Sequence, residues 1–148
     1  MRLQTAIVLT TASMIQFMPR TFAHHSFAGE FDNSTAVTLH GVVMSVEMIN
    51  PHSFIYLDVK TSNGVERWAL EGPGPTQVRR RGLELTLIKP GDELGACGYL
   101  AKKDVLPTRT EPGTGAAARK LQAAVLIKRD GDKILWNNYR QEKCGLDK

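Results

Sequence analysis

Apolar side chains recur at every second position in several short runs of this chain, which is the periodicity of β-strands. The runs that share this pattern are residues 36–48, 53–60, 65–71, 93–100, 122–128 and, more briefly, 133–136. They are rich in β-branched and aromatic residues, and residues that favour turns separate them. The pattern predicts a mostly β domain with short connections between most strands.

Two interruptions of the pattern predict local connections. Asn63-Gly64 lies between two strands, and this dipeptide is a strong signal for a tight hairpin. Gly72-Pro73-Gly74-Pro75 then breaks the sheet, and Thr76 can cap one short helix that runs through Arg81.

The first run changes its alternation near its centre. Val37 and Leu39 share one face, whereas Val42 and Met44 take the opposite parity. A glycine separates the two halves, so we expect a β-bulge or a sharp bend at Gly41.

This order of elements favours an OB-type fold, a small barrel of five or six strands with one short helix. A long coiled first strand, a hairpin, a helix between the third and fourth strands, and a last strand after a long loop all agree with it. The long loop is residues 101–119, whose prolines and glycines predict a flexible excursion. A β-sandwich with an additional helix is the alternative fold.

The start of the chain has the order of an export signal. Arg2 gives a basic start, residues 6–18 are apolar and uncharged, and Thr21 and Ala23 stand at the small-residue positions of a signal peptidase site. The apolar stretch is shorter than the roughly 20 residues of a transmembrane helix. We therefore expect a signal peptide of residues 1–23 and a single mature domain, residues 24–148, that is periplasmic or secreted. An uncleaved membrane anchor is the alternative; after cleavage no integral membrane segment is expected.

Removal of this leader takes away much of the basic balance. The whole chain carries 19 basic and 15 acidic side chains, and loss of Arg2 and Arg20 leaves 17 basic ones, a net charge of +2. Arg79-Arg80-Arg81 is too short to form a basic surface and is expected to be a solvated helix face. Nucleic acid is therefore not an expected partner.

The mature chain contains two cysteines, Cys97 and Cys144. Exported proteins meet an oxidising environment, so we predict a disulfide that ties the C-terminal tail to a strand. The bridge requires the two Cα atoms to lie roughly 4.4 to 6.8 Å apart, which the sequence alone does not show.

Several short segments together resemble a known family. They are residues 23–32 (AHHSFAGEFD), 39–43 (LHGVV), 50–52 (NPH), 68–71 (WALE) and 89–92 (KPGD). By these segments the mature chain resembles small exported bacterial proteins catalogued as domain of unknown function 6152, although Met48 stands where that family usually has an aromatic residue. The resemblance implies export and a single domain, and it carries no established activity, substrate or catalytic residue.

A mature chain that starts at His24 places a free amine and an imidazole Nδ1 on one residue, and these two nitrogens can chelate one metal ion. A third nitrogen from His52 or His25 would complete a set that suits copper(II). Both kinds of nitrogen lose their protons near neutral pH. The alternative interpretation is a solvated terminus without metal, with His52 as a polar loop residue and His40 as a half-buried strand residue.

These observations support three hypotheses on function. The leading one is a non-enzymatic periplasmic binding module, with copper bound through His24 as its most specific version. The second is a copper-dependent oxidoreductase that uses the same terminus; no catalytic residue is assigned, because the sequence has no nucleophile elbow, phosphate-binding glycine loop or Cys-x-x-Cys motif. The third is an accessory module without metal that binds a partner or a small ligand through Phe54, Tyr56 and Trp68, whose ordinary role is cross-strand packing.

Overall fold

The computed structural model describes residues 27–103, 108–138 and 140–145, and most of its regular structure is β-strand. The long strands are β1 (Val37–Glu47), β2 (His52–Thr61), β3 (Gly64–Pro73), β4 (Glu93–Leu100) and β6 (Ala117–Lys128). The shorter elements are α1 (Phe27–Glu30), α2 (Pro75–Arg80), β5 (Thr108–Thr110), β7 (Lys133–Leu135) and the 3-10 helix η1 (Gln141–Cys144).

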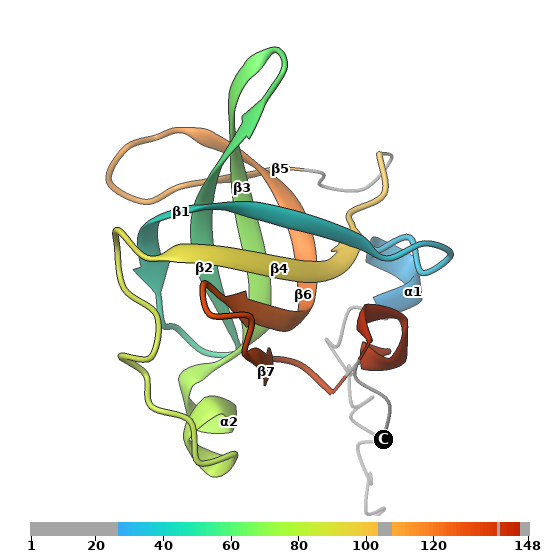
Figure 1. The fold of residues 1–148 in the computed structure, drawn as a ribbon, viewed down its shortest axis with the longest axis vertical. Coiled ribbons are helices and arrows are strands. Elements are labelled where there is room, and N and C mark those ends of the chain that lie inside the picture. Colours follow the sequence, from blue (N-terminus) through green and yellow to red (C-terminus); the bar gives the residue numbers. More distant parts are fainter. Residues whose placement is uncertain (1–26, 104–107, 139, 146–148) are drawn as a thin grey trace, which may run out of the picture.

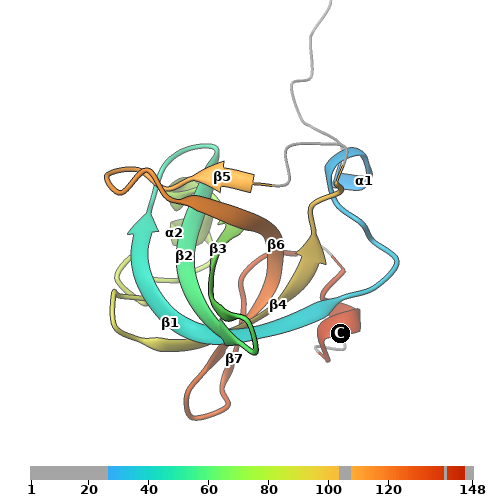
Figure 2. The ribbon, with the colours of Figure 1, turned by 90° about the horizontal axis from the view of Figure 1, so that it is seen from above.

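The long strands close into a barrel with the strand order of an OB-type fold (Figure 1). β1 pairs antiparallel with β2 and β4, β2 pairs with β3, and β4 pairs with β6. A parallel pairing of β3 with β6 completes the ring, and Figure 2 shows the strands curving around one interior. The predicted OB-like barrel is thereby confirmed in preference to the β-sandwich. α2 is the expected helix, whereas α1 and η1 carry no apolar periodicity and were not predicted.

The change of alternation in β1 is present, but it lies at Met44 rather than at Gly41. The register of β1 against β2 shifts between Val43 and Ser45, so Met44 is the extra residue of a β-bulge. Val43 points into the core, and Met44 is exposed. Gly41 has a different role, because a side chain there would collide with the carbonyl oxygen of Asp58 on β2.

The barrel interior is apolar and is closed at one end by α2. The inward residues include Val43, Ile55, Leu57, Leu70, Leu121 and Leu126. Val78 of α2 and Trp136 are fully buried and belong to the same apolar cluster. α2 begins at Pro75 without a side-chain cap, so the fixed φ of proline starts this helix instead of the expected Thr76 cap.

The segment at 101–119, expected to be a flexible loop, contains regular structure. Thr108–Thr110 forms β5, which pairs antiparallel with the beginning of β6, and β6 starts at Ala117 rather than at residue 122. Neither stretch alternates strictly between apolar and polar residues, so the sequence pattern did not predict them. Residues 104–107 lie outside the described parts.

The C-terminal tail is tied to β4. Cys97 and Cys144 form a disulfide with their Cα atoms 5.7 Å apart, which confirms the predicted bridge. The Tyr99 hydroxyl of β4 also donates a hydrogen bond to the carbonyl oxygen of Arg140 at 2.8 Å. Among the described residues, no helix combines the length and the apolar character that a membrane span needs.

Candidate metal and ligand sites on the barrel surface

His52 opens β2 and keeps 48% of its side chain exposed. Its Nδ1 lies 3.1 Å from Oε1 of Glu71, a β3 residue that is almost fully buried. Strand pairing sets this contact, because His52 stands opposite Pro73 and Phe54 stands opposite Glu71. A neutral imidazole that donates its Nδ1–H to a carboxylate presents Nε2 as an acceptor, which is the usual arrangement of metal-binding histidines.

Glu71 joins His52 to a largely buried ion-pair chain. The second oxygen of Glu71, Oε2, lies 3.3 Å from Nζ of Lys120 on β6, and Lys120 also pairs with Glu30 of α1. The Lys120 ammonium lies 5.4 Å from the ring centre of Phe31. We call His52, Glu71, Lys120 and Glu30 the His52 chain; it runs from the start of β2 to the first described helix.

Aromatic packing fixes α1 next to this chain. Phe27 lies edge-on against Tyr99, with 5.4 Å between ring centroids, and stacks on Phe31 at 5.5 Å. Tyr99 of β4, Gln122 of β6 and Glu71 of β3 stand in one cross-strand row. Since neighbouring strands lie about 4.8 Å apart, the backbone at Tyr99 is about 10 Å from that at Glu71.

The other predicted metal ligands, His24 and His25, lie outside the described residues. Within the parts that the structure describes, no three His, Cys, Asp or Glu side chains are grouped so that they could hold a metal ion. Of the three predicted ligands, His52 is therefore the one that lies in the described part of the chain, and the Glu71 carboxylate contacts its ring.

Phe54, Tyr56 and Trp68, the predicted ligand-binding aromatics, do not share a face. Leu57 pairs with Trp68 inside the barrel, and the alternation of β2 places Phe54 and Tyr56 outside it. All three rings are buried. The guanidinium of Arg109 on β5 lies 3.7 Å from the ring centre of Phe54, and its Nε donates to the Tyr56 hydroxyl at 2.9 Å. The structure thus places these rings in packing contacts, since β5 covers the outer pair and the barrel encloses the third.

A polar network holds the segment after β5 against the barrel. Glu111 is almost fully buried and accepts hydrogen bonds from Ser45, Arg67 and Thr114. Arg67 also donates to Asp58, and chiefly this hydrogen bond raises the pKa of Arg67 against the opposing effect of burial. Glu111 lies 44 positions from Arg67, so no local sequence signal could have indicated this contact.

His40 is exposed rather than half-buried as expected. It points outward from β1 opposite Gly95 of β4, and a side chain at Gly95 would come within 2.9 Å of the imidazole ring. The absence of a side chain on its partner therefore leaves His40 on an open surface of the barrel.

Comparisons with known proteins give a family without an assigned activity. The model of a family of unknown function, DUF6152, matches residues 13–106. This match includes the strands β1 to β4, the helix α2 and His52, and it ends before β5, Glu111 and Cys144. No curated protein matches the chain.

Proposed function

The chain belongs to the DUF6152 family of unknown function, and on its own residues we propose that the mature protein is an exported copper(II)-binding module. Export follows from the signal peptide expected at residues 1–23, and a mature chain starting at His24 offers its amine and Nδ1 to the metal. His52 supplies the third nitrogen.

The contact between His52 and Glu71 is the observation that carries this proposal. The carboxylate fixes the ring and favours the tautomer in which Nδ1 holds the proton, so Nε2 is the nitrogen that binds the metal. An imidazole without such a contact would lose more conformational entropy when it binds the metal than the oriented ring of His52 does. His25 is the weaker third ligand, because adjacent residues crowd one another around a shared metal.

Reach supports His24 as the partner of His52. Three residues, 24–26, precede Phe27 and span at most about 10 Å when extended. Phe27 packs on Tyr99, which lies about two strand spacings from Glu71. A terminus that turns back across β6 would therefore bring its amine to the side of the barrel where His52 lies.

The test uses protein exported and processed by a cell, with its first residue determined by intact mass. Copper(II) is titrated and followed by electron paramagnetic resonance and by competition with a chelator of known affinity. We expect one tightly bound ion with nitrogen hyperfine structure. A chain with three glycines added before His24, which separates the amine from His24 without making a histidine the third residue, should lose tight binding, and His52→Ala should weaken binding at least tenfold.

His40→Ala is the matched control, because His40 is an exposed histidine remote in register from Glu71, and it should bind as the wild type does. Loosely bound copper alone, or unchanged affinity after the three-glycine extension, would refute the proposal. Copper-dependent oxidation of a reductant by wild type, lost in His52→Ala, would instead favour the oxidoreductase alternative that shares this terminus.

A further inference from the structure

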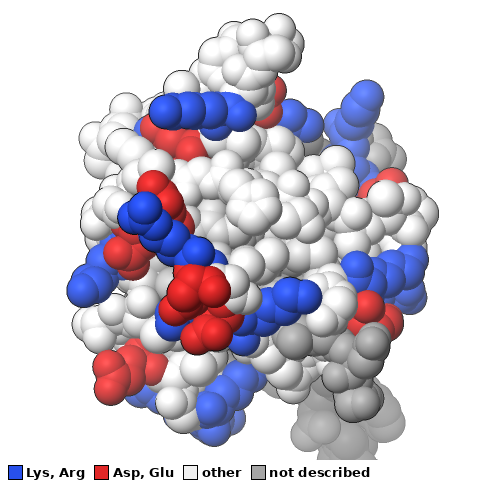
Figure 3. Space-filling model, viewed as in Figure 1, with Lys and Arg blue, Asp and Glu red and all other residues white. Residues whose placement is uncertain are grey.

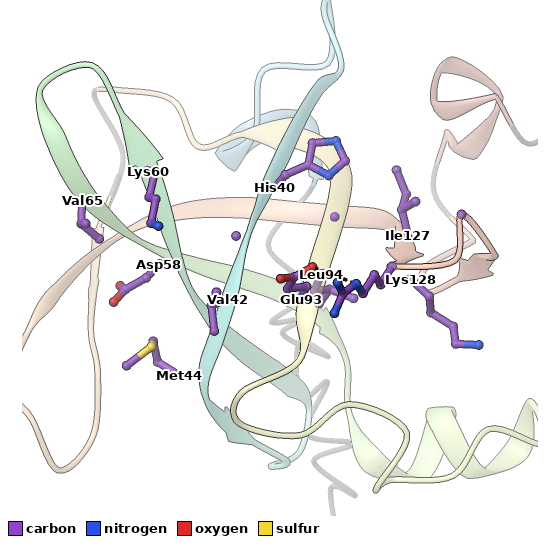
Figure 4. Close-up of a pocket in the computed structure, with 14 residues that line it drawn as sticks. His40, Val42, Met44, Asp58, Lys60, Val65, Glu93, Leu94, Ile127 and Lys128 are labelled. Atoms are coloured by element: carbon purple, nitrogen blue, oxygen red, sulfur yellow. Dashed lines mark ion pairs between the residues drawn. The ribbon is translucent and has the colours of Figure 1, made fainter.

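A groove of about 680 Å³ crosses the outer face of β1 and β4 and extends beneath the β2–β3 hairpin. Figure 4 shows Lys60, Val65 and Met44 on one side of β1, and His40 and Ile127 on the other. None of its lining residues belongs to the His52 chain, so it is a separate surface. Its volume lies within the range of about 300 to 1,000 Å³ that is typical of small-molecule sites.

Part of the apolar lining of this groove is exposed. Val42, Met44 and Val65 are 38%, 43% and 61% exposed. The β1 bulge turns Met44 outward, and in the projecting hairpin Val65 stands opposite Lys60. Figure 3 shows an uncharged area over the middle of β1 and β4 with charged residues around its margin. These exposed side chains beside the groove offer an alkyl chain apolar surface to cover.

The charges at the margin favour an anionic ligand. The acidic lining residues are already paired, Asp58 with Arg67 and Glu93 with Arg129 at 3.3 Å. Lys60 has no ion pair or side-chain hydrogen bond with any residue that the structure describes. The positive charge without a partner in this groove is therefore the Lys60 ammonium, and it stands next to the exposed apolar side chains.

We propose that this groove binds a single-chain anionic amphiphile, a fatty-acid-like alkyl carboxylate taken as a monomer from solution. The carboxylate pairs with Lys60. The alkyl chain lies over Val65, Met44 and Val42, where it removes their apolar surface from water. A cationic amphiphile would meet Lys60 with a like charge, and an uncharged one would gain the apolar contacts alone.

The experiment is an isothermal titration of the full mature protein with dodecanoate below its micelle concentration. The methyl ester of the same acid is titrated as the uncharged control, and dodecyltrimethylammonium is titrated as the cationic control. We expect saturable binding of one dodecanoate, weaker binding of the ester and the weakest binding of the cation. Lys60→Gln should weaken dodecanoate binding about threefold to fivefold and leave the ester unchanged.

Each further variant replaces an exposed side chain, so the barrel should still fold and a change in affinity reports on the groove. Val65→Ser and Met44→Ser should weaken both the carboxylate and the ester, and Lys89→Gln, an exposed lysine outside the groove, should change neither. Thermal unfolding checks that every variant is folded. Equal affinity for acid and ester, an equal effect of Lys89→Gln, or binding only to anionic phospholipid vesicles would each overturn the proposal.

Discussion

Gly72 of β3 lies against the indole of Trp136, and a side chain at Gly72 would overlap the indole nitrogen and its neighbouring ring atoms. Trp136 is fully buried, so the ring has no room to withdraw. We expect Gly72→Ala to lower the free energy of unfolding by about 1 to 3 kcal/mol, as overpacking of a core does. Urea unfolding followed by circular dichroism measures this change.

A double-mutant cycle tests the cause. The Trp136 Nε1 is buried without a hydrogen-bond partner among the described residues, so Trp136→Phe removes both the crowding atoms and an unpaired polar group. Alanine at position 72 should therefore cost less in the Trp136→Phe background than in the wild type. Additive costs would show that Gly72 is needed for another reason.

The barrel strands were predictable because their side chains alternate and their turns have specific chemistry. The strand expected at residues 93–100 is β4 as found, and the strands expected at 53–60 and 65–71 form the β2–β3 hairpin. These signals are local. The bulge at Met44 was displaced from the predicted Gly41, because a change of parity shows that an extra residue exists without showing which residue leaves the ladder.

The contacts of the site could be predicted only in part. His52 was identified from its residue type, but Glu71 was not recognised as its partner, since that contact depends on the register between β2 and β3. Phe54 and Trp68 were grouped although hairpin pairing places them on opposite faces. Register and long-range pairing are tertiary properties, which alternation within a single strand does not encode.

The disulfide should contribute substantially to stability. Cys97 and Cys144 are separated by 47 positions, and a cross-link over such a loop removes conformational entropy from the unfolded chain. Replacing both cysteines with serine should lower the free energy of unfolding by about 2 to 4 kcal/mol. Thiol labelling of the denatured, unreduced protein is expected to find no free thiol; two labelled cysteines would contradict the structure.

Two buried tyrosines predict loss of stability at alkaline pH. Burial raises the pKa of Tyr99, and burial also raises that of Tyr56 although a hydrogen bond from Arg109 opposes it. Above pH about 10 the unfolded chain releases these protons first, so it binds fewer protons than the folded chain and stability falls as pH rises. The two protonated tyrosines therefore contribute fully to the free energy of unfolding below pH about 10, and this contribution is lost as pH rises through their folded-state pKa values.

Tyr99→Phe should reduce the fall in stability between pH about 9 and pH about 11, measured by urea unfolding. The variant also loses the hydrogen bond to the Arg140 carbonyl, which lowers stability at all these pH values and leaves the slope as the informative quantity. All other titratable residues are the same in wild type and variant. An identical slope in wild type and variant would mean that Tyr99 ionises alike in the folded and unfolded chains.

The proposed copper site predicts a specific effect of Glu71, which does not bind the metal itself. Glu71→Gln keeps the size of the side chain but removes the negative charge that orients His52, so copper(II) affinity should fall about tenfold.

Two control variants separate this effect from the other contacts of Glu71. Because Glu71 also pairs with Lys120, the comparison needs Lys120→Met, which breaks the ion pair between Lys120 and Glu71 but leaves the contact between Glu71 and His52. Glu66→Gln, which removes an exposed ion pair with Arg119, is the control for a lost carboxylate on β3. If Glu71 acts by orienting the imidazole, Glu71→Gln weakens binding and changes the nitrogen hyperfine pattern, whereas Lys120→Met and Glu66→Gln leave that pattern unchanged. Equal losses of affinity in Glu71→Gln and Glu66→Gln, which each remove one negative charge, would assign the effect to net charge instead of to the position of His52.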